Sequence, residues 1–330
     1  MILRLIQKLL ITLEYFVNNS YLSLFEREKF SNDMHSLPDL KSFNDRVAIV
    51  MQGPIITKDN FTFETLSLYR KRYPNVLLVL STWDDNIDQD LQKIIDIDVE
   101  VLESKKPKYF GYSNINLQIE STKIGVNFAK SKKVKYCLKT RTDQRIYRHD
   151  FLLFFLSLIN LFQIDDHPFV KNRLLSVSLN TFKYRLYGVT DMLMFGHIND
   201  MLLYWNVDHD KRKFEADDLG STVEQWADAR VCEVYLSTEY LIKIGHKSLF
   251  TLEDSWYVYS KYFCIVDRSS IDLFWFKYNR VNERRGYNNK TRALDEEFTF
   301  SDWINSLNNL ILYKSEDELL LKKKNMSKII

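Results

Sequence analysis

Cysteine is scarce in this chain of 330 residues, with only three, at positions 137, 232 and 264. An odd number of widely separated cysteines provides neither a disulfide framework nor the close spacing of a zinc site. Such usage is typical of a reducing compartment, the cytosol above all. We therefore expect the three thiols to be buried as small apolar side chains.

Glycine and proline are also scarce, with 8 and 5 residues, which excludes collagen-like and disordered classes. The net charge of +2 gives no overall positive field, so no nucleic-acid partner is expected. The remaining composition, 45% hydrophobic and 27% charged, is that of a globular protein. The length suits one large domain or two modest ones.

A run of apolar residues long enough to cross a membrane is missing as well. Residues 1–17 are interrupted by Arg4, Lys8 and Glu14 and fall short of the ~20 apolar residues that a spanning helix needs. No small-residue cleavage site follows, which argues against a signal peptide. The apolar positions form one helical stripe instead, so this helix lies either at a membrane interface or on the domain. The lysines at 322–324 would favour an anionic leaflet.

Between residues 47 and 141, short apolar runs alternate with amphipathic stretches. Continuous apolar runs of this length are typical of strands that are covered on both faces. We predict strands at 47–51, 76–83, 99–102 and 134–138 and helices at 61–73 and 114–130, the second capped by Asn114. The alternation predicts an α/β fold with a largely parallel sheet.

The second half is less regular. Helices are predicted at 151–162, 197–205, 233–245 and 298–312, and strands at 174–179 and 192–196. The aromatic segment 250–263 is predicted to be β, because aromatic residues are enriched in strands.

Polar residues follow three of the predicted strands. They are Gln52 and Gly53, Trp83 and Asp84, and the stretch from Arg141 to Asp143. In parallel sheets, ligands bind outside the carboxyl ends of the strands. The three polar tips are therefore expected to converge at one binding edge.

The third tip is the most informative stretch of the chain. Lys139, Arg141, Asp143 and Arg145 place charges of both signs within seven residues of a buried strand end. Burying such charges is costly without partners. A phosphorylated ligand, with or without a metal, would supply them, which indicates a nucleotide-type site.

Six segments carry a family signal. They are Val47-Ala-Ile-Val-Met-Gln-Gly-Pro-Ile55, Leu80-Ser-Thr-Trp83, Asn114-Ile-Asn-Leu-Gln-Ile-Glu-Ser121 with Gly125, Leu138-Lys-Thr-Arg-Thr-Asp-Gln-Arg-Ile-Tyr147, Gly188-Val-Thr-Asp-Met-Leu-Met-Phe-Gly196, and Glu233-Val-Tyr-Leu236 with Tyr240-Leu241. In order and spacing, over about residues 45 to 250, they resemble the WavE-type lipopolysaccharide-synthesis proteins, a family of bacterial glycosyltransferases.

The resemblance implies a GT-A-like fold, with a Rossmann-type, mostly parallel central sheet flanked by helices. It implies a glycosyltransferase domain at 45–265, with a nucleotide-sugar half at about 45–150 and an acceptor half at about 151–265. Residues 1–44 would then be an N-terminal amphipathic helix and connector. Residues 266–330 would be a peripheral C-terminal extension, helical and basic.

An enzyme of this kind usually holds the donor diphosphate through a divalent metal on an Asp-x-Asp motif. This chain has Arg141-Thr142-Asp143, with one carboxylate. Magnesium can be bound by one or two carboxylates plus phosphate oxygens, so Asp143 could ligate Mg²⁺ or Mn²⁺. Alternatively, Arg141 neutralises the diphosphate or Asp143 accepts hydrogen bonds from donor hydroxyls. The structural alternative is an ion pair of Asp143 with Arg141 or Arg145.

Five other residues are candidates for binding the donor. Gln52 and Gly53 suit a loop that a nucleotide approaches closely, since glycine lacks a Cβ; a simple strand-ending turn is the alternative. Trp83 could stack on a base or sugar, or be buried in the core. Asn116 and Gln118 could contact ribose or sugar hydroxyls. The chain lacks the Gly-x-Gly-x-x-Gly and Walker motifs of dinucleotide and P-loop sites.

An inverting transfer needs a carboxylate to deprotonate the acceptor hydroxyl. Asp191, at the start of a predicted strand, and Glu233, at the start of a predicted helix, are the two candidates for this base. The alternative for both is capping and ion pairing with Arg230.

The sequence therefore predicts a cytoplasmic glycosyltransferase that uses a nucleotide diphosphate sugar and a lipid-linked glycan acceptor. Peripheral attachment to the cytoplasmic face of the inner membrane is a further expectation. The alternatives are a sugar nucleotidyltransferase, or a catalytically degenerate glycan-binding scaffold. The basic cluster of Arg280, Arg284 and Arg285 could bind phosphates, or could be a solvated surface.

Overall fold

The computed structural model describes residues 5, 6, 8–10, 12, 13, 27–30, 47–85, 88–214, 222–230, 232–277 and 296–309. Two compact units divide the chain, at residues 1–34 and 35–330. In the first unit, the described residues from 5 to 13 are helical. Leu5, Leu9 and Leu13 recur there every fourth residue and are 66%, 59% and 42% exposed. Of the helices that the structure describes, none combines the length and hydropathy needed to cross a membrane.

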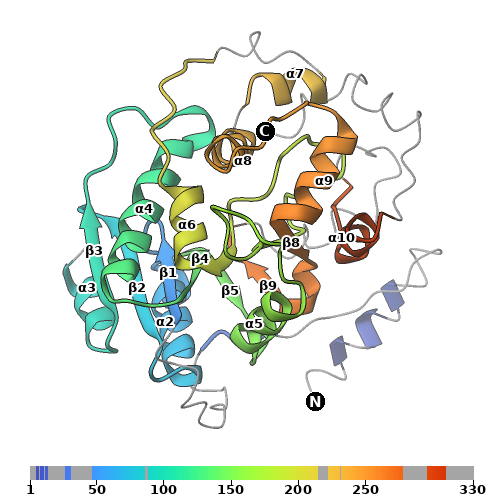
Figure 1. The fold of residues 1–330 in the computed structure, drawn as a ribbon. Helices are drawn as coiled ribbons and strands as arrows, with labels where there is room; N and C mark the ends of the chain where they lie inside the picture. Colours follow the sequence, from blue (N-terminus) through green and yellow to red (C-terminus); the bar gives the residue numbers. More distant parts are fainter. Residues whose placement is uncertain are drawn as a thin grey trace. The chain divides into compact units, whose positions relative to one another are not determined.

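A seven-stranded sheet forms the centre of the second unit, in the order β3-β2-β1-β4-β7-β6-β8 (Figure 1). Its strands are β1 (Val47–Gln52), β2 (Leu77–Trp83), β3 (Glu100–Ser104), β4 (Tyr136–Arg141), β6 (Leu174–Val177), β7 (Met194–His197) and β8 (Phe263–Val266). Strand β7 is antiparallel to both of its neighbours, and every other pairing in this sheet is parallel. The predicted Rossmann-type, mostly parallel central sheet is confirmed.

The described helices of the second unit flank this sheet. They are α2 (Phe61–Arg72), α3 (Asp88–Ile95), α4 (Ile115–Ser131), α5 (Phe151–Leu161), α6 (Ile198–Trp205), α7 (Val223–Asp228), α8 (Glu233–Lys243), α9 (Leu252–Tyr262) and α10 (Phe300–Leu307). Helices α2 and α5 pack together through Tyr69 and Phe151, whose ring centroids are 5.3 Å apart. Helix α4 covers β1 and β2 on the other face, with α6 beside it (Figure 1).

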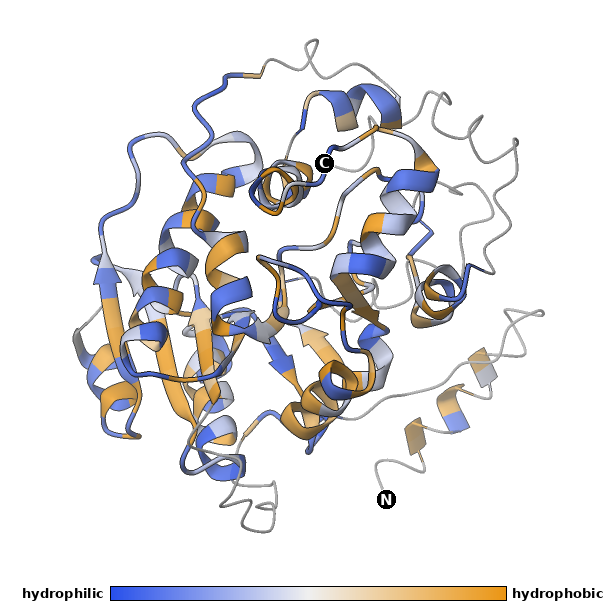
Figure 2. Ribbon diagram, viewed as in Figure 1, coloured by the Kyte–Doolittle hydropathy of each residue, from blue (hydrophilic) through white to orange (hydrophobic). Residues whose placement is uncertain are grey.

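The apolar runs that predicted strands are the buried core of this sheet. All six residues of β1 are buried, and in β2 all but the first are. Figure 2 shows the hydrophobic colour concentrated on these central strands, while the helices around them carry polar stripes. A strand covered on both faces has no polar side to alternate with, which is why its sequence reads as a continuous apolar run.

Strand register brings the polar tips together, as the sequence predicted. Gln52 at the end of β1 lies beside Ser81 of β2 and Arg141 of β4. Trp83, at the end of β2, lies beside Ser104 of β3. The carboxyl ends of four parallel strands therefore meet at one edge of the sheet, where α/β proteins bind their ligands.

The prediction of β structure for residues 250–263 is wrong, because most of this segment is helix α9. Thr251 caps the helix by accepting a hydrogen bond from the Asp254 backbone N–H (3.2 Å). Leu252, Trp256 and Tyr259 then follow helical spacing and are buried. The cap and this spacing outweigh the β-propensity of the aromatic residues, and only 263–266 form a strand.

Two other observations concern an element's start and the chain beyond residue 265. Asn114 precedes α4 in a left-handed conformation (φ 63°) and makes no side-chain cap, so the predicted N-cap is wrong. Residues beyond 265, predicted as a peripheral extension, supply β9 (Leu273–Trp275), which pairs with β5 (Gln144–Ile146) beside the end of β4. The predicted basic cluster at 280–285, the lysines at 322–324 and most of the connector lie outside the described residues.

Candidate functional site

An ion pair occupies the end of β4. The Arg141 guanidinium donates from Nε and Nη2 to the two carboxylate oxygens of Asp143, at 2.8 and 3.0 Å. The indole Nε1 of Trp275 donates to Oδ2 at 3.0 Å. Burial raises the pKa of Asp143, but the hydrogen bonds and charge of Arg141 outweigh it, so the pKa lies below its usual range. Asp143 is thus a buried carboxylate, ionised at neutral pH, with both of its oxygens engaged.

This arrangement bears on the metal predicted at Asp143. The Arg141 guanidinium sits where a cation would bind, and like charges repel at this range. Among the residues that the structure describes, no cluster of three or more His, Cys, Asp or Glu is arranged to hold a metal ion. These residues do not fit Mg²⁺ or Mn²⁺, and the pair formed is the structural alternative. Arg145 takes no part in it and donates to Thr65 Oγ1 at 2.9 Å.

Gln52 and Gly53 form a tight turn at the end of β1. The Gln52 side-chain oxygen accepts from Ser121 Oγ of α4 at 2.8 Å. Gly53 has φ +122°, and a Cβ there would lie 2.8 Å from Thr142 Oγ1, so only glycine fits. Trp83 is 3% exposed and packs in the core. The turn therefore brings the ends of β1 and β4 close together. Because Trp83 is buried, it is not available to stack on a ligand at this edge.

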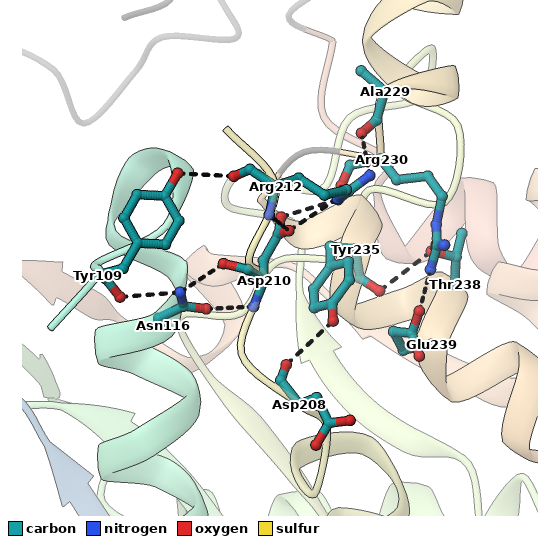
Figure 3. Close-up of polar contacts among 10 residues, drawn as sticks. All are labelled: Tyr109, Asn116, Asp208, Asp210, Arg212, Ala229, Arg230, Tyr235, Thr238 and Glu239. Carbon is teal, nitrogen blue, oxygen red and sulfur yellow. Dashed lines mark hydrogen bonds and ion pairs between the residues drawn. The ribbon is translucent and has the colours of Figure 1, made fainter. Parts of the chain in front are cut away.

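Asn116 holds two loops together. Its Nδ2 donates to the backbone carbonyls of Tyr109 (3.1 Å) and Asp210 (2.8 Å), and its Oδ1 accepts from the Asp210 N–H (2.7 Å). The side chain is fully buried, and its amide is engaged by these backbone groups (Figure 3). It is therefore not available for the predicted contact with ribose or sugar hydroxyls. Gln118, two residues further along α4, is half-buried, and its Oε1 lies 3.4 Å from Lys139 Nζ.

The same network fixes the start of α8, as Figure 3 shows. Arg212 donates to both carboxylate oxygens of Asp210 (2.9 and 3.0 Å) and to the carbonyls of Ala229 and Arg230 (2.8 and 2.7 Å). Arg230 itself pairs with Glu239 at 2.7 Å. The predicted alternative for Glu233, an ion pair with Arg230, is therefore not formed. The segment before α8 is tied to the loop that Asn116 holds.

Asp191 and Glu233, the two predicted bases, meet at this edge. Asp191 lies just before β7 and is 4% exposed. Among the described residues, no hydrogen-bond donor reaches its carboxylate oxygens. Glu233 begins α8, with a side chain 14% exposed and 3.5 Å from Arg185 Nη1. Burial raises the pKa of Glu233; Arg185 opposes this rise and the nearby Asp191 charge adds to it.

Backbone strain marks the residue before Glu233. Cys232 has φ 50° and ψ −124°, a conformation that L-residues other than glycine rarely adopt. Such strain persists only where the surroundings hold it, and it concentrates at functional sites. Burial raises the pKa of the Cys232 thiol to about 12, with a further rise from Glu233. Cys232 thus places Glu233 without offering a reactive thiolate.

Two cations at this edge escaped prediction as site residues. The sequence pattern places Lys139 in the charged stretch at the end of β4 without indicating a role for it, and it does not indicate Arg185. Lys139 is fully buried, and its ammonium group donates to the Asp191 carbonyl. Arg185 reaches Glu233 from the turn that precedes Asp191. A lysine inside an otherwise apolar strand was the available signal for Lys139, whereas Arg185 carried none.

Together these residues place charges of both signs close to one another at one sheet edge. Asp191 offers a carboxylate that accepts no hydrogen bond from the described residues and can therefore act as a proton acceptor. Lys139, Arg141 and Arg185 offer positive charge to an anionic group. Such a set can bind a phosphorylated ligand and take a proton from a hydroxyl beside it.

A model of the WavE lipopolysaccharide synthesis family matches residues 47–249, more than half of the chain. The match ends before α9 and before β9, whose Trp275 contacts Asp143. No curated protein matches the sequence.

Similar solved structures include a glycosyltransferase involved in glycosylation of the major capsid of PBCV-1, at TM-score 0.27 and 12% identity. That likeness covers 49% of this chain and 65% of the other, so this chain spans less than two thirds of it. A second is a cytidylyltransferase from Leptospira borgpetersenii, with a TM-score of 0.31 and 12% identity, which covers 85% of this chain and 98% of the other. A third is HddC from Yersinia pseudotuberculosis, with a TM-score of 0.29 and 11% identity, which covers 53% of this chain and 85% of the other. Likenesses this weak establish neither activity nor substrate.

Proposed function

Because the chain belongs to the WavE lipopolysaccharide synthesis family, we propose that it is a glycosyltransferase. It would move a sugar from a nucleotide diphosphate sugar to a lipid-linked surface glycan, namely lipopolysaccharide core, O-antigen or capsule. One observation supports this proposal most: Asp191 carries a buried carboxylate without a hydrogen-bond donor among the described residues, beside Glu233 and three cations. Burying a carboxylate without hydrogen-bond donors is costly even beside positive charge, so this position suits a donor supplied by the substrate.

In the proposed reaction, Asp191 accepts the proton of the acceptor hydroxyl. The hydroxyl oxygen bonds to the anomeric carbon of the donor sugar as the bond from that carbon to the diphosphate oxygen breaks. The nucleoside diphosphate leaves with the electron pair, and the configuration inverts. Positive charge from Arg141 and Arg185 offsets the charge that develops on the leaving diphosphate. Glu233 lies beside Asp191, and its pKa is raised, first by burial and then by the Asp191 charge, while Arg185 opposes the rise.

The donor would lie across the ends of β1 and β4. There the glycine turn at Gly53 brings backbone close to the ligand, and Gln118 faces the same edge from α4. The Arg141–Asp143 pair would orient a guanidinium toward the diphosphate, replacing the charge that a metal usually supplies. A sugar nucleotidyltransferase remains the rival enzyme, but it usually relies on a glycine-rich loop after the first strand, and this chain has the single Gly53 there.

A panel of UDP-, GDP- and dTDP-sugars tests this proposal, with stabilisation of the purified protein read by thermal shift. We expect one donor to raise the Tm, with Mn²⁺ or with chelator, and nucleoside diphosphate to be released on addition of glycan acceptor. Asp191→Asn should keep donor binding and lose release by about 10²–10⁴-fold. If wild type releases pyrophosphate from a nucleoside triphosphate and sugar phosphate instead, the nucleotidyltransferase is correct. No shift with any donor, and unchanged behaviour of Asp143→Ala, would indicate a scaffold.

The leucine stripe of the N-terminal helix supports a second proposal, that this helix binds the inner-membrane surface. Leu5, Leu9 and Leu13 share one helical face and are exposed, and Lys8 lies among them. An apolar stripe flanked by cations is typical of interfacial helices. Flotation with vesicles of anionic lipid should carry the full chain and leave a version lacking residues 1–17 behind. Equal flotation of both would refute the membrane role.

A further inference from the structure

We propose that Lys139 is the positioning residue of the Asp191–Glu233 pair: it fixes the segment that carries Asp191 and supplies the buried positive charge opposite its carboxylate. The catalytic part of this inference, the effect of Lys139 on the proposed base, rests on the proposed function. Its structural part, a charge coupling between Lys139 and Asp191, stands independently and is tested without a substrate.

The Lys139 side chain is directed into the protein, where its ammonium group contacts three other segments. Lys139 lies opposite Val50 of β1 in the strand register, so its side chain points to the face that α4 covers. Its Nζ donates to the backbone carbonyl of Asp191, lies 3.4 Å from Gln118 Oε1, and sits 4.7 Å from the centre of the Trp205 ring. The ammonium group thus ties β4, α4 and α6 to the segment before β7.

Charged groups from three parts of the chain lie around this lysine: the segment before β7, the end of β4 and the start of α8. Asp191 faces it from the segment before β7, and Arg141 and Asp143 lie further along its own strand end. Glu233 lies beyond Asp191, at the start of α8, paired with Arg185. The neighbours from α4 and α6, Gln118 and Trp205, carry no charge.

A fully buried lysine is expensive unless a nearby negative charge compensates it. Burial lowers the pKa of Lys139 to about 7, although Asp191 raises it. The hydrogen bond to the Asp191 carbonyl fixes the backbone, while the charge acts on the carboxylate. A lysine that only filled space over Trp205 would need neither contact. Removing its charge would leave Asp191 and Glu233 facing each other with one cation fewer.

A double-mutant cycle tests the coupling. Lys139→Met, Asp191→Asn and the double variant are compared by thermal unfolding at pH 6, with Lys139→Gln as a second replacement in case the Met variant fails to fold. We expect the single effects to be non-additive, with at least ~2 °C of Tm recovered in the double variant. The recovery should shrink at pH 9, where Lys139 has lost its proton. Lys135→Met, an exposed lysine on the approach to the same strand, is the control, and its effect should add to that of Asp191→Asn.

Turnover of the donor identified by the panel supplies the functional readout. Lys139→Met should lower kcat more than it raises KM, and the acid limb of its pH profile should move to higher pH by about one unit. Lys139→Arg, which keeps the charge, should restore most of the profile. A purely structural loss would lower activity equally at every pH.

The outcomes separate the two proposals. Additive Tm effects at pH 6 overturn the role of Lys139, whatever the enzyme does. A non-additive cycle with no donor bound by wild type leaves the charge coupling in place and overturns the glycosyltransferase. A non-additive cycle with an unshifted pH profile shows that the coupling does not reach the reaction, and it too overturns the positioning role.

Discussion

Replacing Gly125 by alanine has two opposite effects on the stability of the fold: it raises helix propensity, and it introduces a Cβ into a tightly packed contact. Gly125 lies in the middle of α4, where alanine would stabilise an isolated helix by up to ~1 kcal/mol. Its Cβ, however, would lie 2.3 Å from Val50 Cγ1 and 3.4 Å from Ser81 Cβ. Carbon atoms prefer a separation of roughly 3.5–4 Å, so α4 or β1 would have to move by about 1 Å.

Packing should win this competition. Overfilling a core costs about 1–3 kcal/mol, and an approach of 2.3 Å belongs to the upper part of that range. After the gain in helix propensity, the net loss of unfolding free energy should be about 1–2 kcal/mol, or several degrees in Tm. Because α4 carries Gln118 and Ser121, its displacement would also loosen their contacts with Lys139 and Gln52.

Val50→Ala tests the cause. It removes the methyl group that the new Cβ meets, so the double variant should recover at least ~1 kcal/mol relative to the sum of the single effects. Unfolding in urea, followed by circular dichroism, measures all three proteins. A Gly125→Ala variant that is more stable than wild type, or single effects that add, would show that the close approach of α4 to β1 is not what selects glycine.

Three other outcomes are expected. Burial lowers the pKa of Lys139 from its ordinary value of 10.5 to about 7 in the folded chain. Between pH 7 and pH 10.5, unfolding is therefore accompanied by uptake of a proton at this lysine. Stability should rise by about 2 kcal/mol from pH 7 to pH 8.5 and less so in Lys139→Met, as urea unfolding would measure. Gly53→Ala should destabilise by about 1–3 kcal/mol, because φ is +122° and Thr142 Oγ1 is 2.8 Å away, and thermal unfolding would detect it. The three thiols should resist a disulfide exchange reagent at pH 8 until the protein unfolds, because burial raises the pKa of each.

The sheet was predictable because its signal is local. Buried parallel strands appear as continuous apolar runs, and the polar residues that end them mark the binding edge. The segment at 250–263 shows the limit of such patterns. Its aromatic residues favour a strand, but Thr251 and the spacing of Leu252, Trp256 and Tyr259 favour a helix, and tertiary burial decides between them.

The site was predictable only in part, because its contacts join distant segments. Asp191 and Glu233 could be named from isolated acids at element ends. Nothing local indicates that Arg185 reaches Glu233, or that Trp275 reaches Asp143 across more than a hundred residues. Asn116 shows the reverse error: an amide at a helix start resembles a sugar ligand, yet two loops use all of its hydrogen-bonding groups.

The most direct test of the central claim is release of nucleoside diphosphate from a bound nucleotide sugar, by wild type and by Asp191→Asn, with a lipid-linked glycan acceptor present. The account predicts that both proteins bind the donor with similar affinity and that only wild type transfers the sugar. Equal transfer by the two proteins, or no donor bound by either, would contradict it.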